Sequence, residues 1–171
     1  MQIRIRLRPS LPRLQTLLLL AMLSGCASAP PSTGLQTILI SATAGANQNN
    51  ATAIDLVFVY NINVLPLLPK TGPAWFAGKD ALVAGLATSL EVVSLQIPPM
   101  HLVNMPKDHG FPAGYRKAIG VYAYANYVAA AGQPMFNLTP YGAVGITLAP
   151  DAVTLTGAPP KGWLGNLMSL F

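Results

Sequence analysis

The chain is 171 residues long and carries ten Lys and Arg against five Asp and Glu, a formal net charge of +5. Four of the basic residues lie within the first 13 positions, so the remainder holds six bases against five acids and has no basic patch of the kind that binds nucleic acid. A single cysteine excludes a disulfide within the chain and a metal site built from several cysteines.

Residues 1–25 have the pattern of a lipoprotein signal peptide. The arginine-rich start is followed by a short apolar run over 17–23, where a membrane span needs about 20 apolar residues. The run closes in Leu23-Ser24-Gly25-Cys26, which resembles the lipobox of bacterial lipoproteins. That resemblance implies cleavage before Cys26 and covalent acyl chains, such as palmitate, on it. Because Ala27 follows Cys26, the resemblance also favours sorting of the lipoprotein to the outer membrane. An ordinary signal peptide with a chance cysteine is the alternative.

Three segments are expected after the signal peptide. Residues 26–34 are rich in Ala, Ser and Pro and predict a short lipidated tether. Residues 35–158 are long enough for one domain, and residues 159–171 form an apolar tail. Charged residues make up only 9% of the chain, which indicates either a surface partly covered by a partner or a membrane, or a domain kept soluble by Ser, Thr, Asn and Gly.

The first part of the domain predicts two strands and a helix. Leu35–Thr43 alternates between two faces, and Ala53–Tyr60 is apolar on both, which is typical of a central strand. A turn-rich, uncharged loop over Ala44–Thr52 joins them. After a connection over Leu65–Gly72, Pro73–Leu86 has helical spacing, with Trp75 and Phe76 expected to face the core.

The second part predicts further strands around one long loop. Ser89–Ile97 reads as a strand that Pro98-Pro99 ends, and Met100–Tyr115 as a long loop. A strong strand over Lys117–Tyr127 precedes three short ones: Met135–Leu138, Gly142–Leu148 and Ala152–Thr156. Six to eight strands with one added helix predict an all-β sandwich of Greek-key type.

The tail after Pro159-Pro160 is apolar. Helical spacing would bring five apolar side chains to one side, so that the tail could pack on the sandwich, contact the membrane or dock on a partner. These side chains are Trp163, Leu164, Leu167, Met168 and Phe171.

Few groups suited to catalysis follow the signal peptide. The adjacent pair Asp108-His109 does not orient a base on a nucleophile, and His101 shares a loop with His109 without an evident third metal ligand beyond Asp108. The glycines form no phosphate-binding pattern. We therefore expect a non-enzyme without a metal site, whose only attached group is the lipid.

The order of these parts resembles a known family. A lipobox precedes a strand ending in Ser41-Ala42, an Asn-containing loop, a strand ending in Val59-Tyr60 and an aromatic helix. The segments 94–99 and 118–125 complete the pattern. This order is similar to the TssJ-type lipoprotein of the type VI secretion membrane complex. The resemblance implies a transthyretin-like sandwich with a helical segment, anchored in the outer membrane and facing the periplasm.

The resemblance also implies a partner and a binding loop. Family members bind the periplasmic domain of a large inner-membrane protein, of TssM type, and the loop between the first two strands is implicated in the contact. The matching residues here are Asn47, Gln48, Asn49, Asn50, Ala51 and Thr52. An amide-rich loop offers hydrogen bonds without the cost of desolvating a charge.

Some features depart from the family pattern. Ala51-Thr52-Ala53 stands where the family often has a proline-rich stretch, and neither the 100–115 segment nor the apolar tail has a counterpart. Two rivals therefore remain: a chaperone or pilotin lipoprotein of another envelope assembly, and an envelope hydrolase that depends on His109 or Asp108.

Overall fold

The computed structural model describes residues 32–158; the predicted signal peptide, Cys26, most of the predicted tether and the apolar tail lie outside this range. The strands are β1 (Thr37–Ala42), β2 (Thr52–Val59), β3 (Leu90–Ile97), β4 (Leu102–Pro106), β5 (Gly120–Ala125), β6 (Phe136–Asn137), β7 (Ala143–Leu148) and β8 (Val153–Ala158). The helical segments are α2 (Ala46–Asn49), η2 (Ile62–Leu67), α3 (Gly72–Gly85), α4 (Lys107–Gly110), η3 (Tyr115–Lys117) and η4 (Ala130–Gly132).

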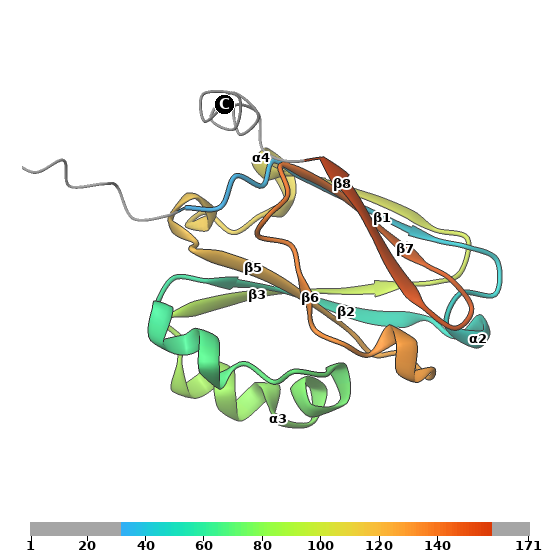
Figure 1. The fold of residues 1–171 in the computed structure, drawn as a ribbon, viewed down its shortest axis with the longest axis horizontal. Helices are drawn as coiled ribbons and strands as arrows, with labels where there is room; N and C mark the ends of the chain where they lie inside the picture. The colour runs from blue at the N-terminus through green and yellow to red at the C-terminus, as the bar shows by residue number, and fades with distance from the viewer. Residues whose placement is uncertain (1–31, 159–171) are drawn as a thin grey trace, which may run out of the picture. The chain divides into compact units, whose positions relative to one another are not determined.

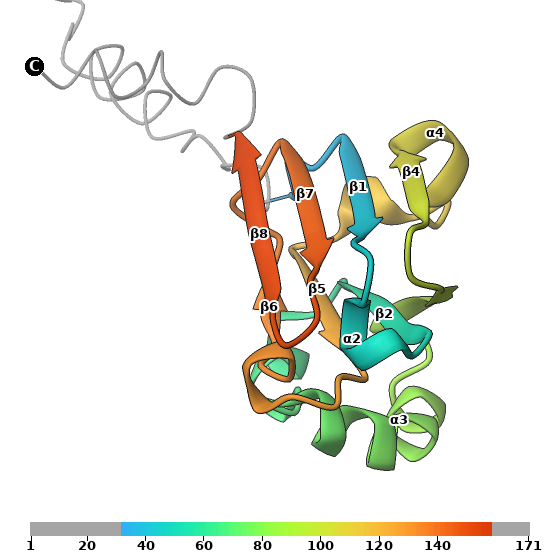
Figure 2. The same ribbon diagram turned by 90° about the vertical axis from the view of Figure 1, so that its right-hand side faces the viewer.

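The eight strands form two four-stranded sheets, which confirms the predicted all-β sandwich with one long added helix (Figure 1). The first sheet has the order β4-β1-β7-β8, with its strands side by side in Figure 2. The second has the order β3-β2-β5-β6. The pair β1–β7 is parallel, and all other neighbours are antiparallel.

An apolar core lies between the sheets. Alternation along each strand sends every second side chain inward, so Ile38 and Ile40 of β1 meet Leu56 and Phe58 of β2, all at 0% exposure. The predicted central position of β2 is confirmed, because it pairs with β3 on one side and β5 on the other. Because β2 is apolar on both faces, removal of both faces from water stabilises the fold.

Helix α3 covers the outer face of the second sheet and forms a second apolar core there (Figure 1). Its start is fixed by the Thr71 hydroxyl, which accepts a hydrogen bond from the Ala74 amide at 3.4 Å, and by Pro73 in the first turn. Trp75 is fully buried, as predicted, and stacks on Tyr124 with ring centroids 4.6 Å apart. Phe76 packs at the margin of this core and is half-buried.

A buried carboxylate also ties α3 to the sheet. Asp55 of β2 is 1% exposed and accepts hydrogen bonds from Trp75 Nε1 at 2.7 Å and Lys79 Nζ at 2.9 Å. The buried charge is thus paired and hydrogen-bonded, which offsets its desolvation. The group fixes the helix and has no access to a substrate, so we assign it a structural role.

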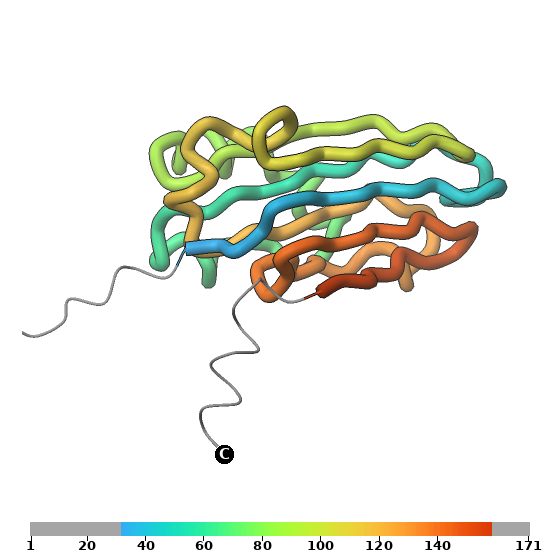
Figure 3. The backbone as a smooth tube through the Cα atoms, turned by 90° about the horizontal axis from the view of Figure 1, so that it is seen from above, coloured from blue at the N-terminus to red at the C-terminus, as the bar shows by residue number. Residues whose placement is uncertain are grey.

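The strands run between two ends of the domain (Figure 3). The loop end consists of residues 44–51, 98–101, 126–128 and 149–151, where β1, β3, β5 and β7 finish. The tether end consists of residues 32–36 and 106–119 together with Ala158, where β1 starts and β8 finishes. The predicted binding loop and residues 32–34, with which the predicted tether ends, therefore lie at opposite ends of the domain.

The prediction of a single long loop over Met100–Tyr115 is wrong. This segment contains β4, which pairs with β1, and the short helix α4. Its strand is an edge strand of five residues that ends in Pro106, and proline is tolerated at such positions. Within residues 32–158, no helix is both long and apolar enough to cross a membrane.

Candidate partner-binding site

The predicted binding loop forms the short turn α2 at the loop end (Figure 2). Gln48, Asn49, Asn50 and Ala51 are exposed there. By contrast, Asn47 is 2% exposed, and Thr52 is 0% exposed as the first residue of β2. Their burial removes these two side chains from any contact surface of the folded domain, and the predicted site is reduced to the four exposed residues.

The backbone of α2 is left-handed. Gly45, Asn47, Gln48 and Asn49 have φ values of 76°, 49°, 55° and 65°. This conformation costs a non-glycine residue about 1–2 kcal/mol, and Asn tolerates it better than most. The run of amide residues is therefore explained in part by the backbone it must adopt. A strained turn persists only where its surroundings hold it in place.

Asn47 is the residue that holds the turn. Its Nδ2 donates to Asn126 O at 3.1 Å, and its Oδ1 accepts from Val128 N at 2.8 Å. Its backbone N–H donates to Ala149 O at 3.1 Å. One buried residue thus connects α2 to the segment after β5 and to the turn between β7 and β8.

Tyr127 completes this connection beneath the turn. Its hydroxyl donates to Ala149 O and lies 3.3 Å from Asn47 N, which donates to it. Burial raises the pKa of Tyr127, and the nearby Asp151 raises it further, while the hydrogen bond from Asn47 acts in the opposite direction. The hydroxyl is therefore a neutral structural donor at physiological pH.

The exposed part of α2 is also held by hydrogen bonds. Gln48 N donates to Pro150 O at 3.1 Å, and Gln48 Nε2 donates to Asp151 Oδ1 at 3.3 Å. Asn50 Nδ2 donates back to Asn47 O at 3.1 Å. The turn is consequently preorganised, and the side chain of Asn49 stands exposed at its end.

Three exposed apolar residues at or beside the loop end were missed by sequence reasoning. Met100 is 80% exposed with a φ of 62°, Leu102 is 66% exposed and Val128 is 57% exposed. Met100 is placed by its N–H, which donates to Thr43 O at 3.4 Å, and Val128 by its bond to Asn47. The proline-rich context of Met100 indicated only a strand end, and nothing in the sequence indicated that its side chain would be exposed at the loop end.

The histidines do not converge on a metal or a reaction centre. His101 lies at the loop end, where its Nδ1 is 3.1 Å from Pro99 O, whereas His109 lies in α4 at the tether end. The five residues of β4 separate them by about 17 Å of strand. Among residues 32–158, no group of three His, Cys, Asp or Glu side chains could hold a metal ion.

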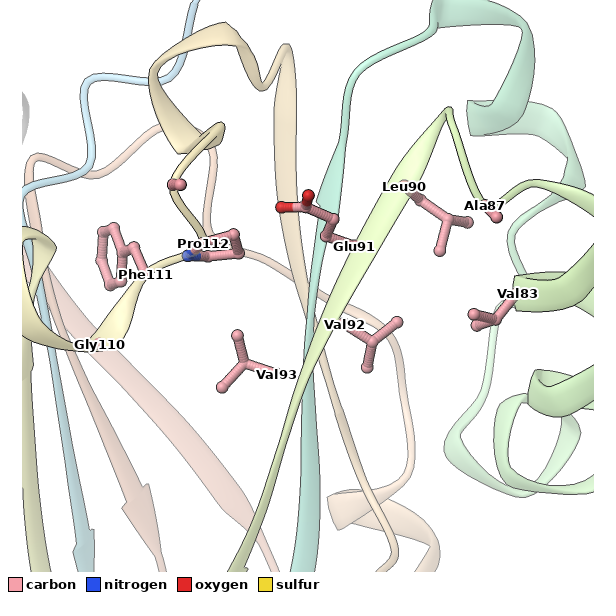
Figure 4. A pocket seen from close by; sticks show the side chains of 10 residues that line it. Val83, Ala87, Leu90, Glu91, Val92, Val93, Gly110, Phe111 and Pro112 are labelled. Carbon is pink, nitrogen blue, oxygen red and sulfur yellow. The ribbon is translucent and has the colours of Figure 1, made fainter.

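A shallow groove of about 570 Å³ runs along the edge strand β3. Figure 4 shows Phe111 and Pro112 on one side of the strand and Val83 and Ala87 on the other. The only titratable side chain lining it is Glu91, whose carboxylate accepts a hydrogen bond from Tyr60 OH at 2.6 Å. Burial and this carboxylate raise the pKa of Tyr60. One acid paired with a neutral phenol does not make a catalytic site.

No family model matches the chain, and no curated protein matches it. Among solved structures, it is similar to the type VI secretion lipoprotein TssJ1 from Pseudomonas aeruginosa, with 15% identity, a TM-score of 0.48 and coverage of 76% of this chain and 98% of that one. Lip from Serratia marcescens, a membrane-bound component of the same type of system, gives 10% identity, a TM-score of 0.49 and coverage of 75% and 98%.

A third likeness is to a chain in a structure of the type VI secretion protein TssM C-terminal domain from EAEC. It has 16% identity, a TM-score of 0.45 and coverage of 71% of this chain and 99% of that one.

Proposed function

We propose that this chain is the TssJ-type lipoprotein of a type VI secretion membrane complex, anchored in the outer membrane by a lipid on Cys26 and facing the periplasm. Its loop end binds the periplasmic domain of an inner-membrane partner of TssM type. The lipobox at Leu23–Cys26 and the order of the elements support the assignment. The role is binding rather than catalysis.

The observation that carries this proposal is the rigid amide turn α2 at the end opposite the tether. Three consecutive left-handed residues, Asn47 to Asn49, are held by hydrogen bonds to two other segments of the chain, the one after β5 and the turn between β7 and β8. Strain of this kind is concentrated at binding sites because a preorganised loop loses little entropy when its partner arrives. The turn presents amide groups in one fixed arrangement.

The chemistry around α2 fits an uncharged protein surface. Gln48, Asn49 and Asn50 offer donors and acceptors, while Met100 and Val128 offer apolar contact at the same end of the domain. Amides lose less on desolvation than charged groups, and exposed methionine adapts to an irregular partner surface. Within the described loop-end segments, Asp151 is the one Asp, Glu, Lys or Arg side chain.

The distances also suit a partner that crosses the periplasm. The seven residue-to-residue steps from Cys26 to Thr33 reach at most about 25 Å from the bilayer. The six residues of β1 add about 20 Å between the tether end and the loop end. The binding surface thus stands away from the membrane that holds the lipid.

The test measures binding between the acyl-free mature chain (Cys26→Ser) and the periplasmic domain of the TssM-type protein from the same bacterium, by calorimetry. The double variant Gln48→Gly, Asn49→Gly removes two exposed amides while keeping a backbone suited to positive φ. Each lost hydrogen bond costs about 1 kcal/mol, and two amides are removed. We therefore expect Kd to rise at least tenfold.

Asn63→Ala is the matched control, because it removes an exposed amide from η2 at the far end of β2. It should leave Kd within about twofold. Absence of binding by the unsubstituted chain would refute the proposed partner. Binding that the double variant leaves unchanged would refute α2 as the site.

A further inference from the structure

Among the edge strands of the described sandwich, β3 is the longest. It has eight residues, whereas the other edge strands β4, β6 and β8 have five, two and six. Edge strands expose unpaired backbone groups, and proteins usually protect them by shortness, by proline or by lysine. The strand β4 ends in Pro106, but β3 contains neither proline nor lysine. The outer edge of β3 therefore lacks these usual protections against pairing with another strand.

The register between β2 and β3 shows which backbone groups of β3 face away from the sheet. Tyr60 N donates to Ser89 O at 2.8 Å, and hydrogen-bonded pairs recur at every second residue of an antiparallel ladder. The odd-numbered residues of β3 therefore form the hydrogen bonds to β2. The N–H and C=O groups of Val92, Ser94 and Gln96 point outward, away from β2.

Hydrogen bonds on the other side of β2 support this assignment. Ile119 N donates to Val59 O at 2.8 Å, and Asn126 N donates to Ala53 O at 2.8 Å. These two residues of β2 thus direct their carbonyl groups toward the β5 side, so Gln96, the register partner of Ala53, receives no hydrogen bond from β2. Within residues 32–158, the outward N–H and C=O groups of β3 have no hydrogen-bond partner.

The groove along β3 has apolar walls on both sides of this edge. Val83 and Ala87 form one wall, and Phe111 and Pro112 form the other (Figure 4). The carboxylate of Glu91, the one titratable group that lines the groove, already accepts a hydrogen bond from a phenol. Successive side chains of a strand point to opposite faces of its sheet, so those of an added strand would meet one wall and then the other. The groove therefore fits an extended segment with apolar side chains.

A second hollow, of about 360 Å³, lies between α3 and β3 and shares Val83 and Val92 with the first. Ser94, Lys79 and Asp80 also line it. Lys79 is already paired with a buried carboxylate, whereas Asp80 is exposed and disfavours an acidic side chain in an added strand. The hollow provides room for side chains at the place where the backbone of β3 is unpaired.

The course of β3 indicates which partner reaches this edge. The strand finishes at Ile97, and the exposed Met100 follows at the loop end, where α2 lies. A segment of the protein that binds α2 can therefore continue along β3. A second copy of this chain fits less well, because antiparallel pairing of two β3 strands would place the loop end of one copy beside the tether end of the other. Two copies anchored in one bilayer would then have opposite orientations.

We propose that the outer edge of β3 binds an extended, apolar segment of the periplasmic partner protein. The segment adds a fifth strand to the second sheet through the backbone groups of Val92, Ser94 and Gln96. This inference rests on the proposed function and adds a second contact to the one at α2. In strand addition, main-chain hydrogen bonds supply affinity, and pockets for alternate side chains supply specificity.

Hydrogen exchange of individual amides, followed by NMR, tests the added strand directly. The acyl-free mature chain is compared alone and in complex with the periplasmic domain of the TssM-type protein from the same bacterium. The amides of Val92, Ser94 and Gln96 should exchange rapidly in the unbound chain and at least about tenfold more slowly in the complex. The amides of Val93 and Leu95 are bonded to β2 in both states and serve as the internal reference.

Ser94→Pro and Ser94→Ala form a matched pair of variants. Proline removes the outward N–H, and its ring lies where an added strand would pair, but the ladder with β2 stays intact because Ser94 N is not part of it. One lost hydrogen bond corresponds to about a fivefold change in Kd, so Ser94→Pro should weaken binding at least fivefold in calorimetry. Ser94→Ala keeps the N–H and should leave Kd within about twofold. If Ser94→Pro fails to fold, the exchange measurement on the unsubstituted chain decides alone.

The outcomes separate this inference from the proposed function. Binding that leaves the three outward amides in rapid exchange, or that a folded Ser94→Pro variant does not weaken, overturns the added strand but keeps the partner at α2. Absence of binding by the unsubstituted chain overturns the proposed partner, and the added strand with it. Slow exchange of these amides in the unbound chain, or a dimer in sedimentation that Ser94→Pro abolishes, would show that another segment or a second copy occupies the edge, and would overturn the inference.

Discussion

The loop end and the tether end of one sandwich are built in opposite ways. At the loop end a left-handed amide turn is fixed by hydrogen bonds that centre on buried Asn47. At the tether end, packed aromatic rings around Phe111 fix a segment that carries exposed charge. Both ends are thus held in place by contacts, whereas the exposed side chains differ: neutral amides at the loop end and basic groups at the tether end.

The largest expected effect on stability comes from removing the amide of Asn47. Asn47→Ala leaves the Val128 N–H and the Asn126 carbonyl without their partner, and because both bonds are partly buried, each loss costs about 1–3 kcal/mol. We expect a loss of about 2–4 kcal/mol in the free energy of unfolding, measured in urea.

Asn63→Ala is again the control, and it should cost less than about 0.5 kcal/mol because that side chain is exposed in η2, at the other end of β2 from α2. Equal effects of the two substitutions would show that Asn47 does not hold the loop end together. Hydrogen exchange should locate the added opening of Asn47→Ala in residues 44–51 and 126–128.

A smaller pair of effects separates backbone strain from packing. Gly45 has a φ of 76°, and a methyl group at this position would lie 3.6 Å from Pro150 Cγ, so Gly45→Ala is strained without a clash and should destabilise by about 1 kcal/mol. Gly78 lies inside α3 with open space around it, so Gly78→Ala should stabilise by about 0.5–1 kcal/mol. If the melting temperature changes in the same direction in both variants, the result would contradict the backbone strain assigned to α2.

The smallest effect on stability, but an informative one, is expected at Met100. Met100→Gly removes an 80% exposed apolar side chain and relieves a φ of 62°. The free energy of unfolding should stay the same or rise by up to about 1 kcal/mol, while affinity for the partner's periplasmic domain should fall several-fold. A loss of stability with unchanged affinity would remove Met100 from the binding surface.

Much of the fold was predictable because alternation along the strands reports burial directly. The apolar run of Ala53–Tyr60 indicated the central strand, and the aromatic spacing after Pro73 indicated the helix. The strand β4 was not predictable, since only Val103 and Met105 face inward and Pro106 interrupts the pattern. Short edge strands depend on pairing with a distant partner, here β1.

The candidate site was predictable only in part. The uncharged loop was identified, but its residues share one amide chemistry, and nothing local distinguishes the buried Asn47 from the exposed Asn49. That difference is set by Asn126 and Val128, some 80 positions away. The exposed Met100 and the bond from Trp75 to Asp55 arise from tertiary contacts in the same way.

The proposed division of roles, with lipid at one end of the domain and the partner at the other, can be tested in one experiment. Site-specific photocrosslinking is carried out in cells of the source bacterium, with the crosslinking residue placed at Asn49 or at Lys117 of the lipidated chain. We expect a crosslink from position 49 to the inner-membrane partner and none from position 117 to that protein. Partner crosslinks from position 117 and none from position 49 would contradict this division.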